Sequence, residues 1–464
     1  MSKYEDIYLR LPIFLQNILC SLEGLRIQYT RFNKEFYRYL KEAEERSSWS
    51  RDQLFEYRDK RLREFIMYAS NNVPYYRKKF REWGIDPRSI RSVEDLRNIP
   101  ILTKDEVKKN FTEFISETVP KSKLVWIHTS GTTGGGFKFY TTKDSIWQQW
   151  AIWWRYRRWH RIPLNGWYGN FGTRYVVPIT QKKPPFWRYD IPGKRVYFSA
   201  YHMNKENLYY YIKEINKRKL LWLHGYPSLI SLLASFILES NLHLGYNVKW
   251  VTTGAENLME HQAEVIRRAF GVKPIQHYGL TEAVANISEC VEGFLHVDED
   301  FSAVEFVPLG SGTYKLIGTN FTNFAMPFLR YDTGDIVRID ENIDRDCNCG
   351  FRGRIVNSID GRKEDYVILR DGRKIGKMDH IFKDLVNIRE AQIYQDKPGE
   401  IYVRVVKGDK YNLEDEKALL RELKKTVGED TKIIVEYIDS LARTPSGKLR
   451  FIVSDIKEGK IDFV

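Results

Sequence analysis

The chain carries the stretch Trp126-Ile127-His128-Thr129-Ser130-Gly131-Thr132-Thr133-Gly134-Gly135-Gly136-Phe137-Lys138-Phe139-Tyr140. The apolar run before it, 124–127, predicts a strand, and the alternation over 137–141 predicts a second strand. From Thr129 to Gly136 the chain contains only Ser, Thr and Gly, whose small side chains let backbone N–H groups and hydroxyls close around an anion. The stretch therefore predicts a phosphate-binding loop, and the ammonium group of Lys138 could assist it.

This loop is not a Walker loop, although Gly131 and Gly136 have the Walker glycine spacing. No Gly-Lys-Ser/Thr follows, and a strand is expected next where a Walker loop leads into a helix. A flexible hairpin is the alternative for a loop of this composition. The segment Ser130–Gly134 resembles the signature loop of the adenylate-forming (AMP-binding) ligase superfamily. The resemblance implies nucleotide contacts from Thr129, Ser130, Gly131, Thr132, Thr133, Gly134 and Lys138.

A second motif, Tyr278-Gly279-Leu280-Thr281-Glu282, follows a predicted strand and resembles the fifth core motif of that superfamily. The resemblance implies a phosphate contact for Thr281, a bound Mg²⁺ on the hard oxygens of Glu282, and adenine stacking on Tyr278. It also implies that the upstream Gly254-Ala255-Glu256 lines the purine pocket. An ordinary turn with a threonine cap is the structural alternative.

Two later motifs extend the resemblance. Arg330-Tyr331-Asp332-Thr333-Gly334-Asp335 is similar to the superfamily's Tyr-Arg-Thr-Gly-Asp, which implies that Asp335 binds the ribose hydroxyls. Asp332 stands where Arg is common. Gly361-Arg362-Lys363-Glu364-Asp365 resembles the hinge motif, with Arg362 on ribose or phosphate and Glu364 in place of the usual hinge Asp.

The last motif, Arg443-Thr444-Pro445-Ser446-Gly447-Lys448-Leu449-Arg450, resembles the C-terminal Ser-Gly-Lys motif. The resemblance implies that Lys448 is catalytic, because an ammonium between carboxylate and α-phosphate offsets charge in the transition state. Five such motifs occur in the superfamily's order. Together with Val73-Pro74-Tyr75-Tyr76 and Leu96–Lys104, they resemble the phenylacetate–CoA ligase/CapK-like (capsular polysaccharide biosynthesis) branch.

The predicted fold class is α/β. Strands are expected at 220–225, 249–253 and 274–278, with helices at 228–239 and 259–270 between them, and this alternation indicates a mostly parallel sheet. Ligands in such sheets bind at the carboxyl ends of strands, where the turns 254–257 and 279–282 would lie. A helical N-terminal extension is expected over 1–85, a large adenylate-forming domain over 86–361 and a small mobile α+β lid over 362–464. In the last, strand patterns at 401–406 and 432–437 flank a helix at 412–427.

A second constellation is independent of the nucleotide motifs. Cys290 and His296 are followed by Cys347-Asn348-Cys349, which together match a closed Cys₃His zinc site. The alternative is three unrelated buried thiols.

The segment 147–201 is dense in aromatic and basic residues. Rings beside guanidinium groups suit an acidic sugar or aryl substrate, whereas aromatic stripes are often core. Trp154, Arg158 and Trp187 serve as probes of a substrate pocket in this segment.

Bulk composition limits the remaining choices. The chain has 464 residues with 42% hydrophobic content, net charge +13 and four cysteines. Such a chain is long enough for two or three domains, and its charge favours polyanionic ligands such as ATP and coenzyme A. The cysteine usage favours a reducing, cytoplasmic setting, and no nucleic-acid-binding motif is present. Charged residues interrupt the N-terminus, so no signal peptide is expected. The apolar Leu9–Leu19 predicts a packed helix, with peripheral membrane contact as the alternative.

The expected activity is that of an acyl-AMP-forming ligase using ATP and Mg²⁺. A substrate carboxylate attacks the α-phosphate, and the acyl group then passes to a nucleophile. Coenzyme A is the default acceptor. A CapK-like alternative joins a sugar acid or amino acid to an amine or hydroxyl, and a second alternative is a catalytically inactive basic scaffold.

Overall fold

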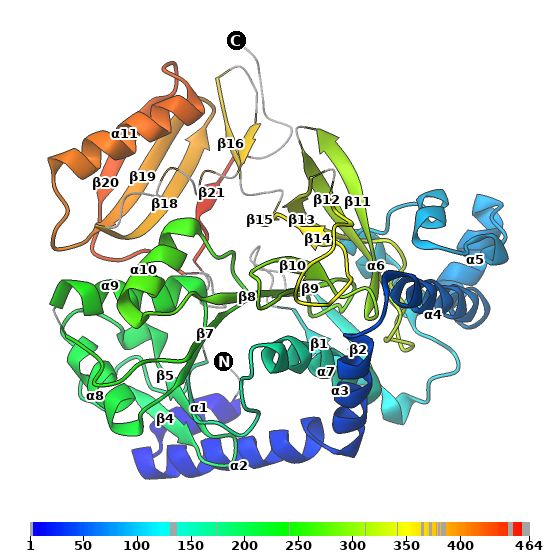
Figure 1. The fold of residues 1–464 in the computed structure, drawn as a ribbon, viewed down its shortest axis with the longest axis horizontal. Coiled ribbons are helices and arrows are strands. Elements are labelled where there is room, and N and C mark those ends of the chain that lie inside the picture. The colour runs from blue at the N-terminus through cyan, green and yellow to red at the C-terminus, as the bar shows by residue number, and fades with distance from the viewer. Residues whose placement is uncertain are drawn as a thin grey trace. The chain divides into compact units, whose positions relative to one another are not determined.

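In the computed structural model, whose ribbon is drawn in Figure 1, the chain forms two compact units. Unit 1 comprises Met1–Gly24, Asn165–Gln276 and Gly361–Val464, and unit 2 comprises Leu25–Leu164 and His277–Asp360. The described residues are 3–129, 137–172, 174–240, 242–310, 312–340, 342–362, 366–370, 374–376, 378, 381, 387–443 and 449–456. The chain crosses from one unit to the other within helix α2 (Ile13–Arg31) and strands β8 (Ile275–Gly279) and β15 (Ser358–Arg362).

The larger sheet of unit 1 is mostly parallel. Its strands run in the order β7–β6–β3–β5–β4, with β8 pairing in parallel with β7 and the edge strand β4 antiparallel to β5. The strands are β3 (Tyr168–Phe171), β4 (Trp187–Asp190), β5 (Arg195–Phe198), β6 (Trp222–Gly225) and β7 (Trp250–Thr253). The accompanying helices are α1 (Lys3–Arg10), the 3₁₀ turn η5 (Ala200–His202), α8 (Leu208–Arg218), α9 (Pro227–Ser240) and α10 (Glu260–Phe270). The strands and helices expected between 220 and 278 are thus confirmed.

The C-terminal part of unit 1 is an α+β layer. Strands run in the order β20–β19–β18–β21, and α11 lies along this sheet in Figure 1. Apolar side chains of α11 belong to the same core cluster as those of the strands. The elements are β16 (Tyr366–Ile368), β17 (Lys374–Gly376), β18 (Ile388–Lys397), β19 (Glu400–Lys407), α11 (Leu413–Val427), β20 (Lys432–Tyr437) and β21 (Ile452–Ser454). Asn412 begins α11 with a capping box, as its preference for the N-cap predicts. The expected strands and helix of this part are confirmed.

Unit 2 begins with the helical segment that the sequence predicts. Its helices are α3 (Lys34–Arg46), α4 (Arg51–Asn72), α5 (Pro74–Trp83), α6 (Lys104–Lys109) and α7 (Lys143–Trp159), with 3₁₀ turns η1 (Pro87–Ser89), η2 (Val93–Asn98), η3 (Phe111–Phe114) and η4 (Lys121–Lys123). The segment after Ser92 forms the 3₁₀ turn η2. Its N-terminus carries a capping box, because Asp95 accepts from the Ser92 backbone.

The strands of unit 2 are antiparallel to their neighbours. They are β1 (Val125–His128), β2 (Lys138–Thr141), β9 (Asn286–Glu289), β10 (Leu295–Val297), β11 (Ser302–Gly310), β12 (Thr313–Asn320), β13 (Tyr331–Arg338) and β14 (Ile355–Val356). β1 pairs with β2 as the hairpin expected on either side of the Ser/Thr/Gly loop. β14, β10, β9 and the end of β8 pair in that order, and β11, β12, β13 and β15 form a separate sheet.

The α/β fold class is confirmed by these elements. The three segments 1–85, 86–361 and 362–464 stay a prediction. Over the part of the chain that the structure describes, no helix is long and apolar enough to cross a membrane.

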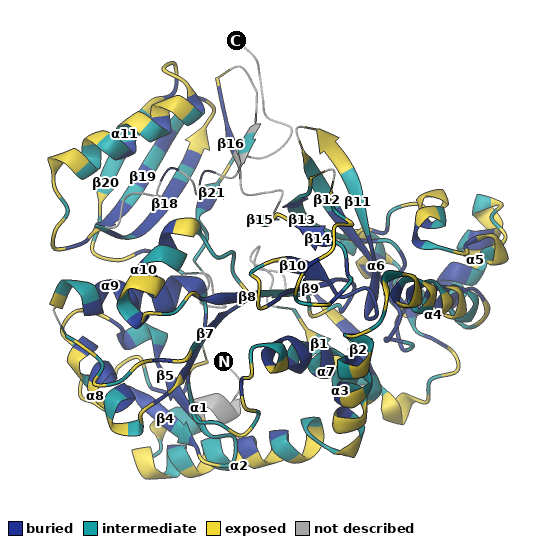
Figure 2. Cartoon of the chain, in the orientation of Figure 1, coloured by how far each residue is buried: buried dark blue, intermediate teal, exposed yellow. Residues whose placement is uncertain are grey.

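A buried cluster of charges ties the helices of unit 2 to the turn after β10. The Arg155 guanidinium on α7 is fully buried and donates to Asp298 at 2.6 Å and to Asp300 at 2.8 Å. Arg46 of α3 contacts Asp300 at 2.6 Å. Glu299 lies between Arg58 of α4, at 3.2 Å, and Arg354, at 2.6 Å. Figure 2 shows how much of this region is buried.

The charge cluster predicts a large stability loss from Arg155→Met. Removing the guanidinium leaves Asp298 and Asp300 buried with fewer positive partners, which costs about 3–5 kcal/mol of unfolding free energy. Arg158→Met is the matched control, since the Arg158–Glu44 pair at 3.1 Å is exposed and should contribute no more than about 1 kcal/mol. Urea unfolding of both variants measures the difference. Equal midpoints for the two variants would show that the buried cluster does not stabilise the fold.

Candidate active site

The end of β8 is shaped around Gly279. A Cβ atom on this glycine would lie 2.8 Å from Asn286 Oδ1, 2.9 Å from Trp153 Nε1 and 3.0 Å from His277 Cε1. The turn that follows is fixed because Gln149 donates to the Leu280 carbonyl at 2.6 Å. Ala283, directly after Glu282, has φ +56°, a left-handed conformation that is uncommon for alanine. The backbone around Thr281 and Glu282 is therefore tightly constrained.

Tyr278 and Asp335, 57 residues apart in the chain, meet through a hydrogen bond. The Tyr278 hydroxyl donates to Asp335 Oδ2 at 2.6 Å. Burial, and then the Asp335 charge, raise the pKa of the Tyr278 phenol well above its ordinary value, so the tyrosine stays a donor. Thr333 Oγ1 accepts from the Asp335 amide at 3.1 Å. The residues expected to bind adenine and ribose thus lie side by side.

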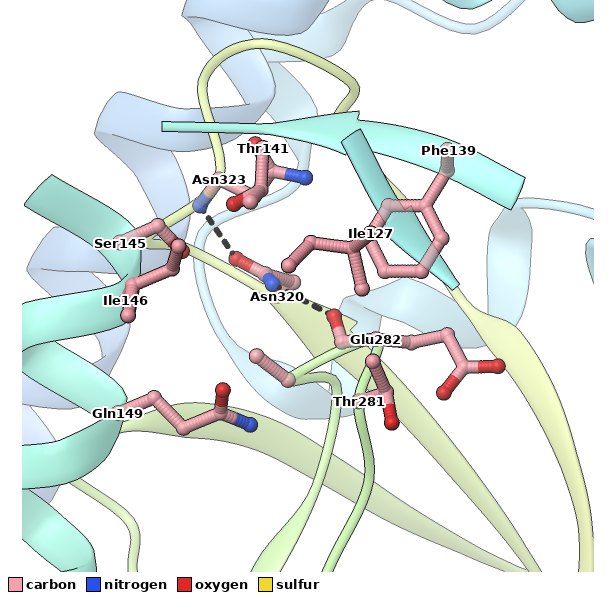
Figure 3. Close-up of a pocket in the computed structure, with 11 residues that line it drawn as sticks. Ile127, Phe139, Thr141, Ser145, Ile146, Gln149, Thr281, Glu282, Asn320 and Asn323 are labelled. Carbon is pink, nitrogen blue, oxygen red and sulfur yellow. Dashed lines mark hydrogen bonds between the residues drawn. The ribbon is translucent and has the colours of Figure 1, made fainter. Parts of the chain in front are cut away.

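Glu282 lies against a small, mostly polar cavity, shown in Figure 3. The cavity is lined by Ile127, Phe139, Thr141, Ser145, Ile146, Gln149, Thr281, Glu282, Ala283, Asn320 and Asn323. Its volume of about 30 Å³ holds one or two water molecules, far less than a nucleotide needs. Tyr331 Oη approaches Glu282 Oε1 at 3.5 Å. The cavity is therefore a polar space behind the carboxylate, too small to be the nucleotide pocket itself.

Asn320, at the end of β12, holds the backbone of Glu282. Its side chain is fully buried, donates to the Glu282 carbonyl at 2.8 Å and accepts from the amides of Thr322 at 2.6 Å and Asn323 at 2.7 Å (Figure 3). No sequence pattern marks Asn320 as a site residue, because an asparagine at the end of a strand carries no distinctive signal.

The expected phosphate loop is described only at its two ends. Ser130, Gly131, Thr132, Thr133 and Gly134 lie outside the described residues. Thr129 closes the hairpin: its amide donates to the Phe137 carbonyl at 2.9 Å, and its Oγ1 accepts from the Phe137 amide at 3.1 Å. Lys138 is exposed, and it pairs with His128 in the β1–β2 register.

Two residues of the motif before Asp335 have structural partners. Arg330, with φ +52°, donates to Glu305 at 2.9 Å and to the Ile99 carbonyl at 2.6 Å. Asp332, which stands where arginine is common, pairs with Lys315 at 2.9 Å. These contacts hold the start of β13, from which Asp335 projects.

The turn Gly254–Glu256, in unit 1, contacts the C-terminal segment. Glu256 Oε1 accepts from the Leu449 amide at 2.8 Å, and Glu256 Oε2 accepts from the Ser228 amide at 3.2 Å. Ala255 has φ +66°. Burial raises the pKa of Glu256, although the nearby Arg443 opposes this shift. The Glu256 carboxylate thus accepts the amide of the residue that follows Lys448 in sequence.

Arg443 completes this contact and was missed as a functional candidate. Its guanidinium donates to Ser228 Oγ at 2.9 Å and pairs with the buried Glu390. Burial raises the pKa of Glu390. Lys448 and Glu364 lie outside the described residues, and only the backbone of Arg362 is described.

The three probes of the aromatic and basic segment differ in burial. Trp154 and Trp187 are 6% and 8% exposed. Trp187 belongs to the core of unit 1 and donates to the Tyr189 hydroxyl at 2.9 Å. Arg158 is exposed and pairs with Glu44. Burial of the two rings favours the core interpretation, and a substrate contact for any of the three stays a prediction.

Cys290, His296, Cys347 and Cys349 converge in unit 2. Their ligand atoms all lie within 4.8 Å of one another. Cys290 Sγ lies 3.8 Å from Cys347 Sγ, and Cys349 Sγ lies 3.5 Å from His296 Nε2. All three cysteines are free thiols. The sequence spacing therefore identified side chains that the fold brings together.

The tautomer of His296 suits a metal ligand. His296 Nδ1 lies 2.9 Å from the Gly353 carbonyl, which can only accept, so Nδ1 carries the proton and Nε2 keeps its lone pair toward the thiols. The pKa of Cys290 is lowered, first by a hydrogen bond from Cys349 and also by His296. Burial raises the pKa of Cys347, and the hydrogen bond to Cys290, followed by burial, raises that of Cys349. Three sulfurs and one imidazole nitrogen are the donor set of closed structural zinc sites.

Comparison with known proteins gives similarity over the whole chain. Residues 367–455 match the family model described as the CapK C-terminal domain. Protein CapK of Staphylococcus aureus is 30% identical over 460 residues, which cover 97% of this chain and 99% of that protein. Phenylacetate-coenzyme A ligase of Escherichia coli strain K12 is 28% identical over 354 residues, 69% of this chain and 73% of that protein.

The fold is also that of a solved structure. 2-Hydroxyisobutyryl-CoA ligase in the postadenylation state, in complex with R3-HIB-AMP, superposes with a TM-score of 0.67 at 17% identity. The match covers 88% of this chain and 91% of that one.

Proposed function

The chain belongs to the CapK family within the adenylate-forming ligase superfamily, and we propose that it uses ATP to activate a carboxylic acid as acyl-AMP. The observation that carries this proposal is the hydrogen bond between Tyr278 and Asp335 beside the constrained Thr281–Glu282 turn. This bond supports the proposal because the resemblance assigns adenine to Tyr278 and ribose to Asp335, two parts of one ligand.

In the proposed first step, a carboxylate oxygen attacks the α-phosphorus of ATP. The bond to the bridging oxygen breaks, and pyrophosphate leaves with the electron pair. Asp335 would bind ribose, Tyr278 would stack on adenine, and Thr281 would contact a phosphate. Glu282 would hold Mg²⁺, which when bound supplies neutralising charge to the phosphates. Lys448 would donate to the oxygens that gain charge in the transition state.

In the proposed second step, the thiol of coenzyme A attacks the acyl-AMP carbonyl carbon and AMP leaves. This acceptor is supported by the relatives, which include phenylacetate-coenzyme A ligases. The net charge of +13 suits a polyphosphate co-substrate. Transfer to an amine or hydroxyl would release pyrophosphate in the same way but would yield no thioester.

The proposed activity predicts pyrophosphate release that depends on a carboxylic acid. We expect one or more acids of a panel to support release and, with coenzyme A present, to yield a thioester. Lys448→Ala should slow acyl-AMP formation by about 10²–10³-fold while ATP affinity stays nearly unchanged, because a preorganised charge acts mainly on the transition state. Lys397→Ala, an exposed lysine at the end of β18, is the control. Wild-type adenylation by Lys448→Ala would refute this role.

The Glu256–Arg443–Glu390 contacts support a positioning role in the same reaction. Arg443 and Leu449 flank Lys448 in sequence, and both bind groups of unit 1: Ser228 and Glu390 for Arg443, and Glu256 for Leu449. Burial raises the pKa values of Glu256 and Glu390, and the charge of Arg443, which pairs with Glu390, opposes both shifts. We infer that Arg443 fixes one end of the lysine-bearing segment for adenylation, and that Glu256 fixes the other.

This inference predicts that Arg443→Leu slows acyl-AMP formation by about 10²-fold, because a displacement of about 1 Å in a catalytic group has that effect. ATP affinity should change less than about two-fold. The reaction of preformed acyl-AMP with the acceptor should keep most of its rate. The matched control is Arg404→Leu on β19, which removes a partly exposed ion pair with Glu436 of β20. Equal loss in both half-reactions would mean that Arg443 acts only on stability.

We also propose that Cys290, His296, Cys347 and Cys349 hold a structural zinc ion. The support is the Cys₃His donor set within 4.8 Å and the backbone carbonyl that fixes the His296 tautomer. When bound, zinc would cross-link the β9–β10 turn to the segment before β14 and stabilise both.

Elemental analysis should then find about one zinc per chain, as a single closed site holds. Cys347→Ser should lose the metal and lower the melting temperature by about 5 °C or more, since metal binding contributes folding free energy. Cys20→Ser is the matched control, because Cys20 lies outside the cluster. A metal-free preparation with the same melting temperature would rule out the proposed site.

A further inference from the structure

Helix α2 exposes an unusual number of large apolar side chains. Seven large apolar side chains of α2 are exposed: Ile13, Phe14, Ile18, Leu19, Leu22, Leu25 and Tyr29. Phe14 is 63% exposed, Leu22 55% and Tyr29 76%. Figure 2 shows exposed segments, coloured yellow, along α2. Isolated surface apolar residues need no explanation, but a continuous set on one helix does.

The exposed residues form one stripe. Phe14, Ile18, Leu22, Leu25 and Tyr29 follow one another at steps of four, four, three and four residues. This spacing places them on a single helical face, about 22 Å long at 1.5 Å per residue. Ile7 on the preceding helix α1 is also exposed. We call these five residues of α2 the apolar stripe.

The other face of α2 is attached to the protein by polar contacts. Gln16, which is buried, accepts from Arg188 at 2.6 Å. Asn17 accepts from the Tyr189 amide of edge strand β4 at 2.9 Å, and Ser21 donates to the Tyr189 carbonyl at 3.3 Å. The helix thus covers a sheet edge with polar side chains and directs apolar ones to solvent. Burial in this chain's own core does not explain the stripe.

Two exposed basic residues lie close to the apolar stripe in sequence. Arg10 precedes α2 by three residues, and Arg26 follows Leu25 within the helix. The sequence of α2 contains a single acidic residue, Glu23. Positive charge beside an exposed apolar face is the pattern of helices that lie in an anionic membrane surface.

We propose that the apolar stripe of α2 docks this protein on an anionic lipid bilayer, with the helix parallel to the surface. Phe14, Ile18 and Leu22 would enter the boundary between headgroups and acyl chains, while the flanking basic residues contact lipid phosphates. A second copy of the chain is the competing occupant. Net charge favours the bilayer, because two copies at +13 each repel one another whereas an anionic surface attracts them.

Vesicle co-sedimentation tests this proposal with the full chain. The probes are vesicles of phosphatidylcholine alone and of phosphatidylcholine with one-third phosphatidylglycerol. The wild type should bind the anionic vesicles. The triple variant Phe14→Ser, Ile18→Ser, Leu22→Ser should bind them at least about ten-fold more weakly, since it removes the buried apolar area. Because all three side chains are exposed, the variant should keep its melting temperature.

The matched control is the triple variant Tyr209→Ser, Leu309→Ser, Leu413→Ser, which removes exposed apolar residues elsewhere on the chain. It should bind anionic vesicles like the wild type. Sedimentation velocity on the same proteins reports self-association. The proposal is overturned if the wild type binds no anionic vesicle, if the stripe variant binds as well as the wild type, or if the stripe variant only dissociates a dimer. It does not depend on the proposed ligase activity.

Discussion

Much of unit 2 depends on the buried ion pairs that Arg155 makes with Asp298 and Asp300. A guanidinium and the two carboxylates of Asp298 and Asp300 are buried together, and each would be costly alone. Burial tends to raise the pKa of Asp300, yet Arg155 and Arg46 hold it at about 2, so this carboxylate stays charged throughout the physiological range. The helices α3 and α7 are thereby fixed to the turn after β10.

The same network reaches the nucleotide motif. Asp298 also accepts from the Asn286 side-chain amide, and Asn286 Oδ1 accepts from Trp153 at 2.9 Å and His277 at 3.0 Å. His277 directly precedes Tyr278, whose hydroxyl binds Asp335. A continuous set of buried hydrogen bonds therefore orients the strand end that the ligase proposal requires. The buried charge cluster and the candidate site are thus connected through Asp298 and Asn286.

The two acidic residues of the candidate site have different surroundings. Asp335 is buried and already bonded by Tyr278, which restricts it to one orientation. Asn320 holds the backbone of Glu282, and Tyr331 Oη approaches the Glu282 carboxylate at 3.5 Å. A rigid carboxylate suits recognition of a defined pair of hydroxyls. A carboxylate on a fixed backbone offers the hard oxygen ligands that Mg²⁺ prefers.

Hydrophobic periodicity and residue chemistry were enough to predict the α/β class, the strands and helices between 220 and 278 and the grouping of Cys290, His296, Cys347 and Cys349, because these depend on local spacing and residue type. Other features depend on contacts between distant segments. The Tyr278–Asp335 bond, the Asn320 contact with Glu282 and the partners of Arg443 join residues 38 to 215 positions apart, which no local pattern encodes. Likewise, composition alone does not distinguish buried core rings such as Trp154 and Trp187 from rings that line a ligand-binding surface. The apolar face of α2 points outward because the opposite face bonds to backbone groups of Tyr189 on edge strand β4. Those bonds form only when the chain folds.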